Sequence, residues 1–337
     1  MNVLLLASHA IAEYDDLRML TDLGYDVFAP GGYEKPTETG EGMRPPLPDV
    51  PYHADLHQRC LEQREKHAGE DVSWAIDWAK ADLHPDLIDW ADIIICHHFL
   101  PQWVAAQWTR IHRKRVIWRT CGQSNAELEL MMRPYVRDGL QIVRYSPKEH
   151  HLGNYAGADA VIRFGKYPDD FPAWTGEVRQ VINFTQHLYQ RHPATNWEFW
   201  EVATSDLTRL PCGPGSEVIG GVGGMSTGAM YDMLARSRCY LYTGTQPASY
   251  TLGLMEAMLV GIPIVSIGPS WMQYPELFEG HELAGFAFEN PDDAASLLRL
   301  WLNDEAAAKE VGTHQRDVAL REFSIDVVGP KWQAFLG

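Results

Sequence analysis

Short runs of consecutive apolar residues alternate along the chain with segments in which apolar residues recur every three or four positions. Continuous apolar runs are typical of strands buried on both faces of a parallel sheet, and the second spacing is typical of amphipathic helices. The order begins at the amino terminus, where residues 2–7 predict a strand, 14–23 a helix and 25–28 a second strand. The chain is therefore predicted to be an α/β protein built from βαβ units.

The first half of the chain continues this pattern. Further buried strands are predicted at residues 92–96, 116–118, 141–145 and 160–164. Residues 31–54 are rich in proline and glycine and are predicted to be irregular. Residues 169–178 contain Pro172 and Gly176 and are interpreted as a linker. A first domain is therefore expected at residues 1–178.

The second half predicts another α/β domain, at residues 179–320. Its strands are expected at residues 181–184, 217–220, 240–243 and 264–266. Its helices are expected at residues 227–238, 252–259, 294–302 and 306–323. The two halves together predict two Rossmann-like domains with parallel sheets.

Candidate chemistry concentrates in residues 240–266, YLYTGTQPASYTLGLMEAMLVGIPIVS, which predict strand, loop, helix and strand. Ligands of open parallel sheets lie beyond the carboxyl ends of the strands, where the first turn of the next helix presents unpaired N–H groups to phosphate. Glu256 lies about one turn inside this helix, where a carboxylate suits the hydroxyls of a sugar. The stretch therefore predicts a nucleotide-sugar site. The loop and first turn add the candidate donor contacts Ser249, Tyr250, Thr251 and Leu252.

The string TLGLMEAMLVGIPIVS resembles the donor-binding motif of family 4 glycosyltransferases, which have the GT-B fold. The resemblance implies two Rossmann-like domains that face each other across a cleft, and it gives Glu256 the ribose of the nucleotide. It also implies a last helix, at residues 321–337, that crosses back to the first domain. The family usually has another Glu eight residues earlier, where this chain has Ala248.

The same resemblance marks a second departure. In relatives the first donor-domain strand ends in Gly-Arg, and a Lys follows, so that two cations hold the diphosphate. Residues 217–220 lead here into a glycine-rich segment without a basic residue. We therefore expect the backbone N–H groups of Gly223 and Gly224 to approach phosphate instead. Relatives also carry another strand and helix in this region, so a shortened carboxy-terminal donor domain is expected.

In the first domain, polar residues follow the predicted strands. His97 and His98 end the strand at 92–96, and many family 4 enzymes have a His at this place near the transferred sugar. We expect a catalytic role for one of this pair, with His98 preferred. Arg119 ends the next strand and is a candidate for a phosphate contact. Arg163 and Lys166, near the end of the segment 160–164, are further candidates for phosphate.

The composition of the chain limits the classes of partner that it is expected to bind. The net charge of −17 argues against general binding to nucleic acid, which requires cations that neutralise phosphate. The five cysteines are not spaced as a metal knuckle and are expected to be reduced thiols of a cytoplasmic protein. No metal site, cofactor or obligate protein partner is indicated, and a peripheral contact with a membrane remains open.

The family resemblance implies transfer of a sugar from a nucleotide-diphosphate sugar, UDP- or GDP-linked, to a hydroxyl acceptor, with retention at the anomeric carbon and without metal. The acceptor would be a glycan, a lipid-linked glycan or a small molecule. Three alternatives stay open at this point. They are a non-catalytic homologue that binds nucleotide sugar, a GT-B sugar-nucleotide epimerase, and a phage-type enzyme that glycosylates a modified DNA base.

Overall fold

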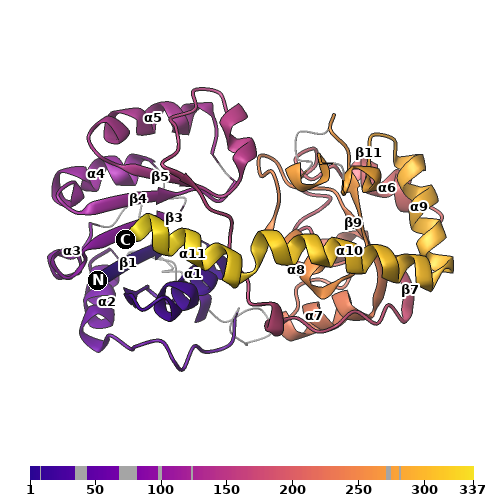
Figure 1. Ribbon diagram of the computed structural model, residues 1–337, viewed down its shortest axis with the longest axis horizontal. Coiled ribbons are helices and arrows are strands. Elements are labelled where there is room, and N and C mark those ends of the chain that lie inside the picture. The colour runs from indigo at the N-terminus through magenta and orange to yellow at the C-terminus, as the bar shows by residue number, and fades with distance from the viewer. Residues whose placement is uncertain are drawn as a thin grey trace. The chain divides into compact units, whose positions relative to one another are not determined.

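The structure is a computed structural model of the 337-residue chain, and it describes residues 1–7, 9–34, 44–67, 82–97, 101–122, 124–270, 275–280 and 282–337. The described residues fall into two compact units. The first unit takes the residues up to Lys166 together with Ile325–Gly337, so both ends of the chain lie on it (Figure 1). The second unit takes Tyr167–Ser324.

The first unit contains a six-stranded sheet in the order β2-β1-β3-β4-β5-β6, and all its pairs are parallel. Its strands are β1 (Asn2–Ala7), β2 (Asp26–Phe28), β3 (Ile93–His97), β4 (Arg115–Arg119), β5 (Gln141–Arg144) and β6 (Ala160–Val161). Leu5 lies opposite Ile95, which in turn lies opposite Ile117, so β-branched and leucine side chains fill the centre of the sheet. Such runs suit strands that are covered on both faces.

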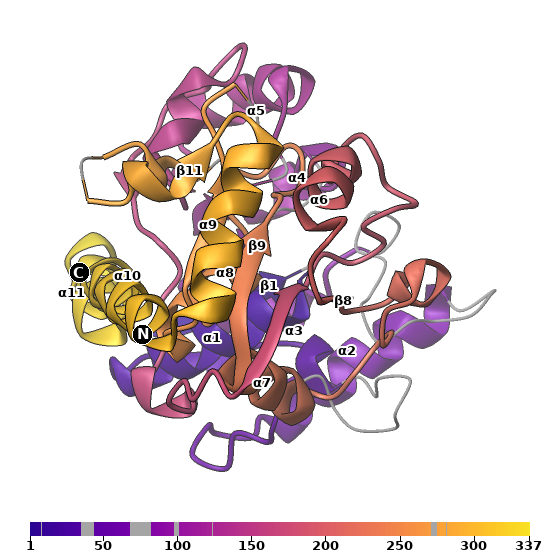
Figure 2. The ribbon, with the colours of Figure 1, turned by 90° about the vertical axis from the view of Figure 1, so that its right-hand side faces the viewer.

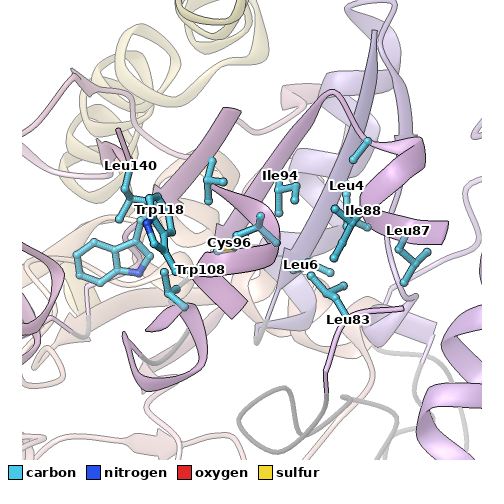
Figure 3. Close-up of a cluster of buried hydrophobic side chains, with 14 of the residues drawn as sticks. Leu4, Leu6, Leu83, Leu87, Ile88, Ile94, Cys96, Trp108, Trp118 and Leu140 are labelled. Carbon is cyan, nitrogen blue, oxygen red and sulfur yellow. The ribbon is translucent and has the colours of Figure 1, made fainter. Parts of the chain in front are cut away.

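Helices cover both faces of this sheet. They are α1 (Ala10–Asp22), α2 (Ala54–His67), α3 (Pro85–Trp90), α4 (Pro101–Ile111), α5 (Ala126–Arg137) and α11 (Ile325–Leu336). Because side chains alternate along a strand, Leu4 and Leu6 enter one apolar cluster with α3, α4 and α5 (Figure 3). Val3 and Leu5 enter another cluster with α1 and α11, where Trp332 is fully buried.

The second unit contains a five-stranded parallel sheet in the order β11-β10-β9-β7-β8. Its strands are β7 (Val178–Asn183), β8 (Arg209–Pro211), β9 (Ser237–Tyr242), β10 (Ile264–Ile267) and β11 (Ala287–Phe288). Its helices are α6 (Trp197–Thr204), α7 (Thr227–Arg236), α8 (Leu252–Val260), α9 (Pro291–Asn303) and α10 (Glu305–Phe323). Figure 2 faces this unit and shows α9 across the sheet, where its Trp301 packs with Leu241 and Val265.

The predicted class, α/β with two Rossmann-like domains, is confirmed by these two parallel sheets. One predicted strand is wrong, because residues 217–220 lie in a 3-10 turn, η4 (Ser216–Ile219), where Val218 is 66% exposed. The strand beside β7 is instead β8. The units divide after Lys166 and after Ser324, and α11 belongs to the first unit. Among the described residues, no helix is long and apolar enough to cross a bilayer.

A buried ion pair ties α5 to the sheet of the first unit. The Arg144 guanidinium at the end of β5 donates to both carboxylate oxygens of Glu129, at 2.7 Å each. Ser124 Oγ (2.5 Å) and the Ala156 N–H (2.8 Å) also donate to Glu129. Burial opposes ionisation of Glu129, but the bonds from Arg144 and Ser124 outweigh it and hold the pKa of this carboxyl below its usual value of 4.5.

We expect Glu129→Gln to lower the free energy of unfolding by about 3–5 kcal/mol, because the variant leaves the Arg144 charge buried without its partner. Arg137→Met changes an exposed cation of the same helix and should stay within about 0.5 kcal/mol of wild type. Urea denaturation at neutral pH measures both variants. Equal midpoints for the two variants would show that the pair contributes nothing specific.

The pH dependence of the wild type follows from the same pair. Because the pKa of Glu129 is lower in the folded than in the unfolded chain, its contribution is present above pH 4.5 and is lost as pH falls through the folded value. The difference in stability between wild type and Glu129→Gln should therefore shrink below pH 4.5. A difference that is constant with pH would contradict this assignment.

Candidate functional site

The stretch predicted as the centre of the site forms β9, a loop and α8 at the carboxyl edge of the second sheet. Thr251 caps α8, and its Oγ1 accepts a hydrogen bond from the Leu254 N–H at 3.3 Å. The N–H groups of Leu252 and Gly253 in the first turn have no acceptor within a helix, because such acceptors would lie before its start. This end of α8 therefore presents donors and the positive end of the helix dipole to an anion.

Glu256 is only 1% exposed, one turn inside α8. Its charge acts on the hydroxyl group of Tyr240, which lies on β9. Burial raises the pKa of the Tyr240 hydroxyl, and the negative charge of Glu256 adds to the effect. The Tyr240 hydroxyl accepts a hydrogen bond from the Phe184 N–H (3.2 Å), just beyond β7. Glu256 is thus buried within the helix that follows β9.

The loop between β9 and α8 carries two predicted donor contacts, Ser249 and Tyr250, which are both buried. The Tyr250 ring packs against Phe323 of α10, with ring centroids 5.5 Å apart. This contact holds the loop against α10, and the donor contacts predicted for Ser249 and Tyr250 stay predictions. Ala248, where relatives have a Glu, lies in a turn and donates its N–H to the Thr245 carbonyl at 2.8 Å.

The glycine-rich segment is a closed loop, and this corrects the role predicted for Gly223. The Gly223 N–H donates to Ser216 Oγ at 2.9 Å, and the Gly223 carbonyl accepts from the Gly213 N–H at 2.9 Å. The Gly221 N–H donates to the Ser216 carbonyl. Because these donors are used inside the loop, they do not form the anion cradle that we expected. Gly224 follows the loop, and its predicted phosphate contact stays a prediction.

The loop that leaves β7 contains two basic residues that the sequence analysis missed. His187 has a left-handed backbone (φ 52°) and follows β7 by four residues. Its ring lies over Gly215, where an added Cβ would stand 2.3 Å from His187 Nδ1. Arg191 is exposed, and within the described part of the chain no acidic side chain forms an ion pair with it. The sequence signal was their place after the strand predicted at residues 181–184, whereas we expected the phosphate contacts after residues 217–220.

In the first unit, two predicted basic residues are buried and paired with neighbouring carboxylates of α1. His97, at the end of β3, has Nε2 2.8 Å from Asp16 Oδ2. Lys166 has Nζ 2.6 Å from Asp15 Oδ2, and both side chains are almost fully buried. The phosphate contact predicted for Lys166 is therefore corrected to a structural ion pair. His98 lies outside the described residues.

Arg119 is also corrected, because its side chain is fully buried. Its guanidinium donates to the Arg144 carbonyl at 3.2 Å and to the Ile162 carbonyl. Its Cζ lies 4.5 Å from the centre of the Phe164 ring, so the cation is held within the core. Arg163 is half-buried and stays a candidate for phosphate. In the described part of the chain, no group of three or more His, Cys, Asp or Glu is arranged to hold a metal ion.

The Gly215 contact can be tested with a matched pair of variants. Gly213→Ala and Gly215→Ala both place a Cβ on a residue with positive φ, so each should cost about 1–2 kcal/mol of stability. Only Gly215→Ala should also displace the His187 ring, because Gly213 has open space around its Cβ position. The His187 ring resonances in the NMR spectrum measure this. Unchanged resonances in Gly215→Ala would contradict the contact.

Comparison with known proteins concerns both the second unit and the whole chain. Residues 197–332 match a family model described as glycosyl transferase-like. A search of curated proteins finds no match. Among solved structures, Anabaena HepE in complex with UDP and glucose is 13% identical, with a TM-score of 0.67, and covers 100% of this chain and 99% of its own.

Two other solved structures have the same architecture. An α-glucosyltransferase in complex with UDP-glucose and DNA is 9% identical, with a TM-score of 0.62 and full coverage of both chains. TarM is 14% identical, with a TM-score of 0.55 over 73% of this chain, which spans only 54% of TarM. At these identities the likeness concerns the fold. The chain therefore has the GT-B fold of these glycosyltransferases, and its residues 197–332 resemble a glycosyl transferase-like family.

Proposed function

We propose that this protein is a glycosyltransferase that moves a sugar from a nucleotide-diphosphate sugar to a hydroxyl acceptor. The observation that carries the proposal is the buried carboxylate of Glu256, beside the donor end of α8 and within the region that matches the glycosyl transferase-like model. In this reading Glu256 accepts hydrogen bonds from the ribose hydroxyls, and the first turn of α8 faces the diphosphate. UDP is the first nucleotide to test, because it is bound in the HepE and TarM complexes.

The leaving diphosphate needs positive charge around it as the bond to the sugar breaks. In this unit the predicted Gly223 cradle is closed, whereas His187 and Arg191 follow the carboxyl end of β7. We assign the positive charge to Arg191 and a hydrogen bond to the phosphate to the His187 ring. On the resemblance to family 4 we also propose retention at the anomeric carbon and activity without a metal ion. The anomeric coupling constant of the product and activity in excess chelator test these two points.

The second candidate is a protein that binds nucleotide sugar without transferring it. It is considered because Ala248 stands where family 4 enzymes usually have a glutamate. Binding of UDP-glucose without turnover over a broad hydroxyl panel would favour it. A DNA acceptor, as in the α-glucosyltransferase complex, fits this chain less well because its net charge is −17.

We expect Glu256→Gln to weaken UDP binding about 10- to 100-fold, because hydrogen bonds to a charged group contribute about 1.5–3 kcal/mol. Glu310→Gln, which removes an exposed carboxylate from α10, is the matched control and should bind UDP as wild type does. Isothermal titration measures the dissociation constants. Equal affinity in Glu256→Gln and wild type would remove Glu256 from the site.

Arg191→Ala should weaken UDP binding about fivefold at low ionic strength, and the loss should shrink in high salt, because the interaction of exposed charges is screened. Lys309→Ala removes an exposed cation from α10 and serves as the control. The same titration at two salt concentrations measures the effect. A salt-independent loss, or one equal to that of Lys309→Ala, would argue that Arg191 does not contact the diphosphate.

A further inference from the structure

A buried carboxyl group at the carboxyl edge of the first sheet takes part in none of the contacts described so far. Glu149 lies in η2 (Pro147–His151), directly after β5, and is only 6% exposed. Its Oε2 accepts hydrogen bonds from Thr120 Oγ1 at 2.6 Å and from the Tyr145 N–H at 3.2 Å. Thr120 follows β4, so the carboxyl group bridges the ends of two adjacent strands.

The other oxygen of this group is unsatisfied. Glu149 Oε1 is buried, and none of the residues that the structure describes donates a hydrogen bond to it. Leaving a buried acceptor without a partner is costly, and nearly all such groups in native proteins bind the protein, ordered water or a ligand. Because Oε2 is fixed by two donors, the group is held in one orientation, and Oε1 is prepared to meet a partner from outside the protein.

The charges around Glu149 indicate the chemistry of that partner. Burial raises the pKa of Glu149 to about 7, while the Thr120 bond and the Arg144 charge lower it and the Glu129 charge raises it. Arg144 is already paired with Glu129, and Arg119 is bonded to carbonyls. An anion would therefore meet the carboxyl groups of Glu129 and Glu149, and an added cation would lie beside the guanidinium groups of Arg119 and Arg144. A neutral hydroxyl is the partner that fits.

Titratable and charged groups surround Glu149 on its own segment and on other elements of the first unit. Elsewhere in the unit they are Arg119, Cys121, Glu129 and Arg144. Its own segment adds Lys148, His150 and His151. Cys121 does not titrate in the same range, because burial and the Glu149 charge raise the pKa of its thiol to about 12.

We propose that Glu149 forms a hydroxyl-binding site for a neutral polyol, in which Oε1 accepts a hydrogen bond from one hydroxyl of the acceptor. The inference rests on the proposed function, because it gives the first unit the acceptor while the second unit holds the nucleotide. Its place agrees with the rule that ligands of parallel sheets lie beyond the carboxyl ends of the strands. Glu149 is then a binding residue whose orientation is set by Thr120.

Glycerol and glucose are the probes, and saturation-transfer NMR measures their affinity. We expect wild type to bind at least one of them saturably, and Glu149→Gln to bind it about tenfold more weakly. Glu127→Gln, an exposed carboxylate on α5, should match wild type. Thr120→Val should weaken binding, because it frees the carboxyl group, and Thr120→Ser should preserve it.

The affinity of the wild type for the probe, measured over a series of pH values, distinguishes a binding role of Glu149 from a purely structural one. Affinity should rise between pH 6 and pH 8, because an ionised carboxylate accepts a stronger hydrogen bond from a hydroxyl. In Glu149→Gln the affinity should not change over this range. This series needs only the folded wild type, so it remains decisive if a variant fails to fold.

Three results would overturn the proposal. They are equal affinity in Glu149→Gln and wild type, no saturable binding of either probe by wild type, and a wild-type affinity that is flat with pH. UDP binding is measured on the same samples. Intact UDP binding with failed polyol binding would remove this inference alone, whereas a wild type that does not bind UDP would remove the proposed function.

Discussion

A carboxylate inside an apolar helix is the constraint on which the functional account depends. Six of the nine residues of α8 around Glu256 are buried apolar residues, namely Leu254, Met255, Ala257, Met258, Leu259 and Val260. An ionised group in such surroundings is expensive unless hydrogen bonds compensate it. Glu256 lies in the helix that follows β9, and parallel sheets bind ligands beyond the carboxyl ends of their strands, so the proposed contact with a ribose is consistent with this rule. We propose that the first turn of α8 and Arg191, which follows β7, complete the site.

In the first unit, buried polar and charged residues contact one another and stabilise the fold. Two consecutive carboxylates of α1, Asp15 and Asp16, hold Lys166 and His97 within the protein. Arg144 is held by both oxygens of Glu129. The carboxylates of Asp15 and Glu129 each have a cation as partner, which is what allows the burial of charge. Among the described residues Glu149 forms no ion pair: its Oε2 accepts hydrogen bonds from Thr120 and Tyr145, and its Oε1 has no hydrogen-bond partner.

The sequence predicted best those elements in which burial requires a particular pattern of apolar residues. Residues 2–7 form β1 with the predicted bounds, because a strand covered on both faces must be apolar throughout. The strand predicted at 217–220 is wrong because the glycines on either side of its apolar residues decide the conformation. Gly215 and Gly220 adopt positive φ, and the segment between them forms a turn. The strand β8 was missed because its three residues, Arg209–Pro211, offer no apolar run.

A motif singled out one residue of the candidate site. The donor-type string points to Glu256, which is buried, and its contact with a ribose stays a prediction. For Arg119 and Lys166 the sequence gave the residue type and the strand end, but it could not show that carbonyls and Asp15 already occupy these cations. Partners distant in sequence decide whether a charged residue serves structure or ligand, and no local pattern records them.

The most direct measurement is a crystal structure of the protein with UDP-glucose. The account predicts that the ribose hydroxyls lie within hydrogen-bond distance of the Glu256 carboxylate and that the diphosphate lies at the first turn of α8. A nucleotide bound elsewhere, with Glu256 still buried and in contact only with protein atoms, would contradict it.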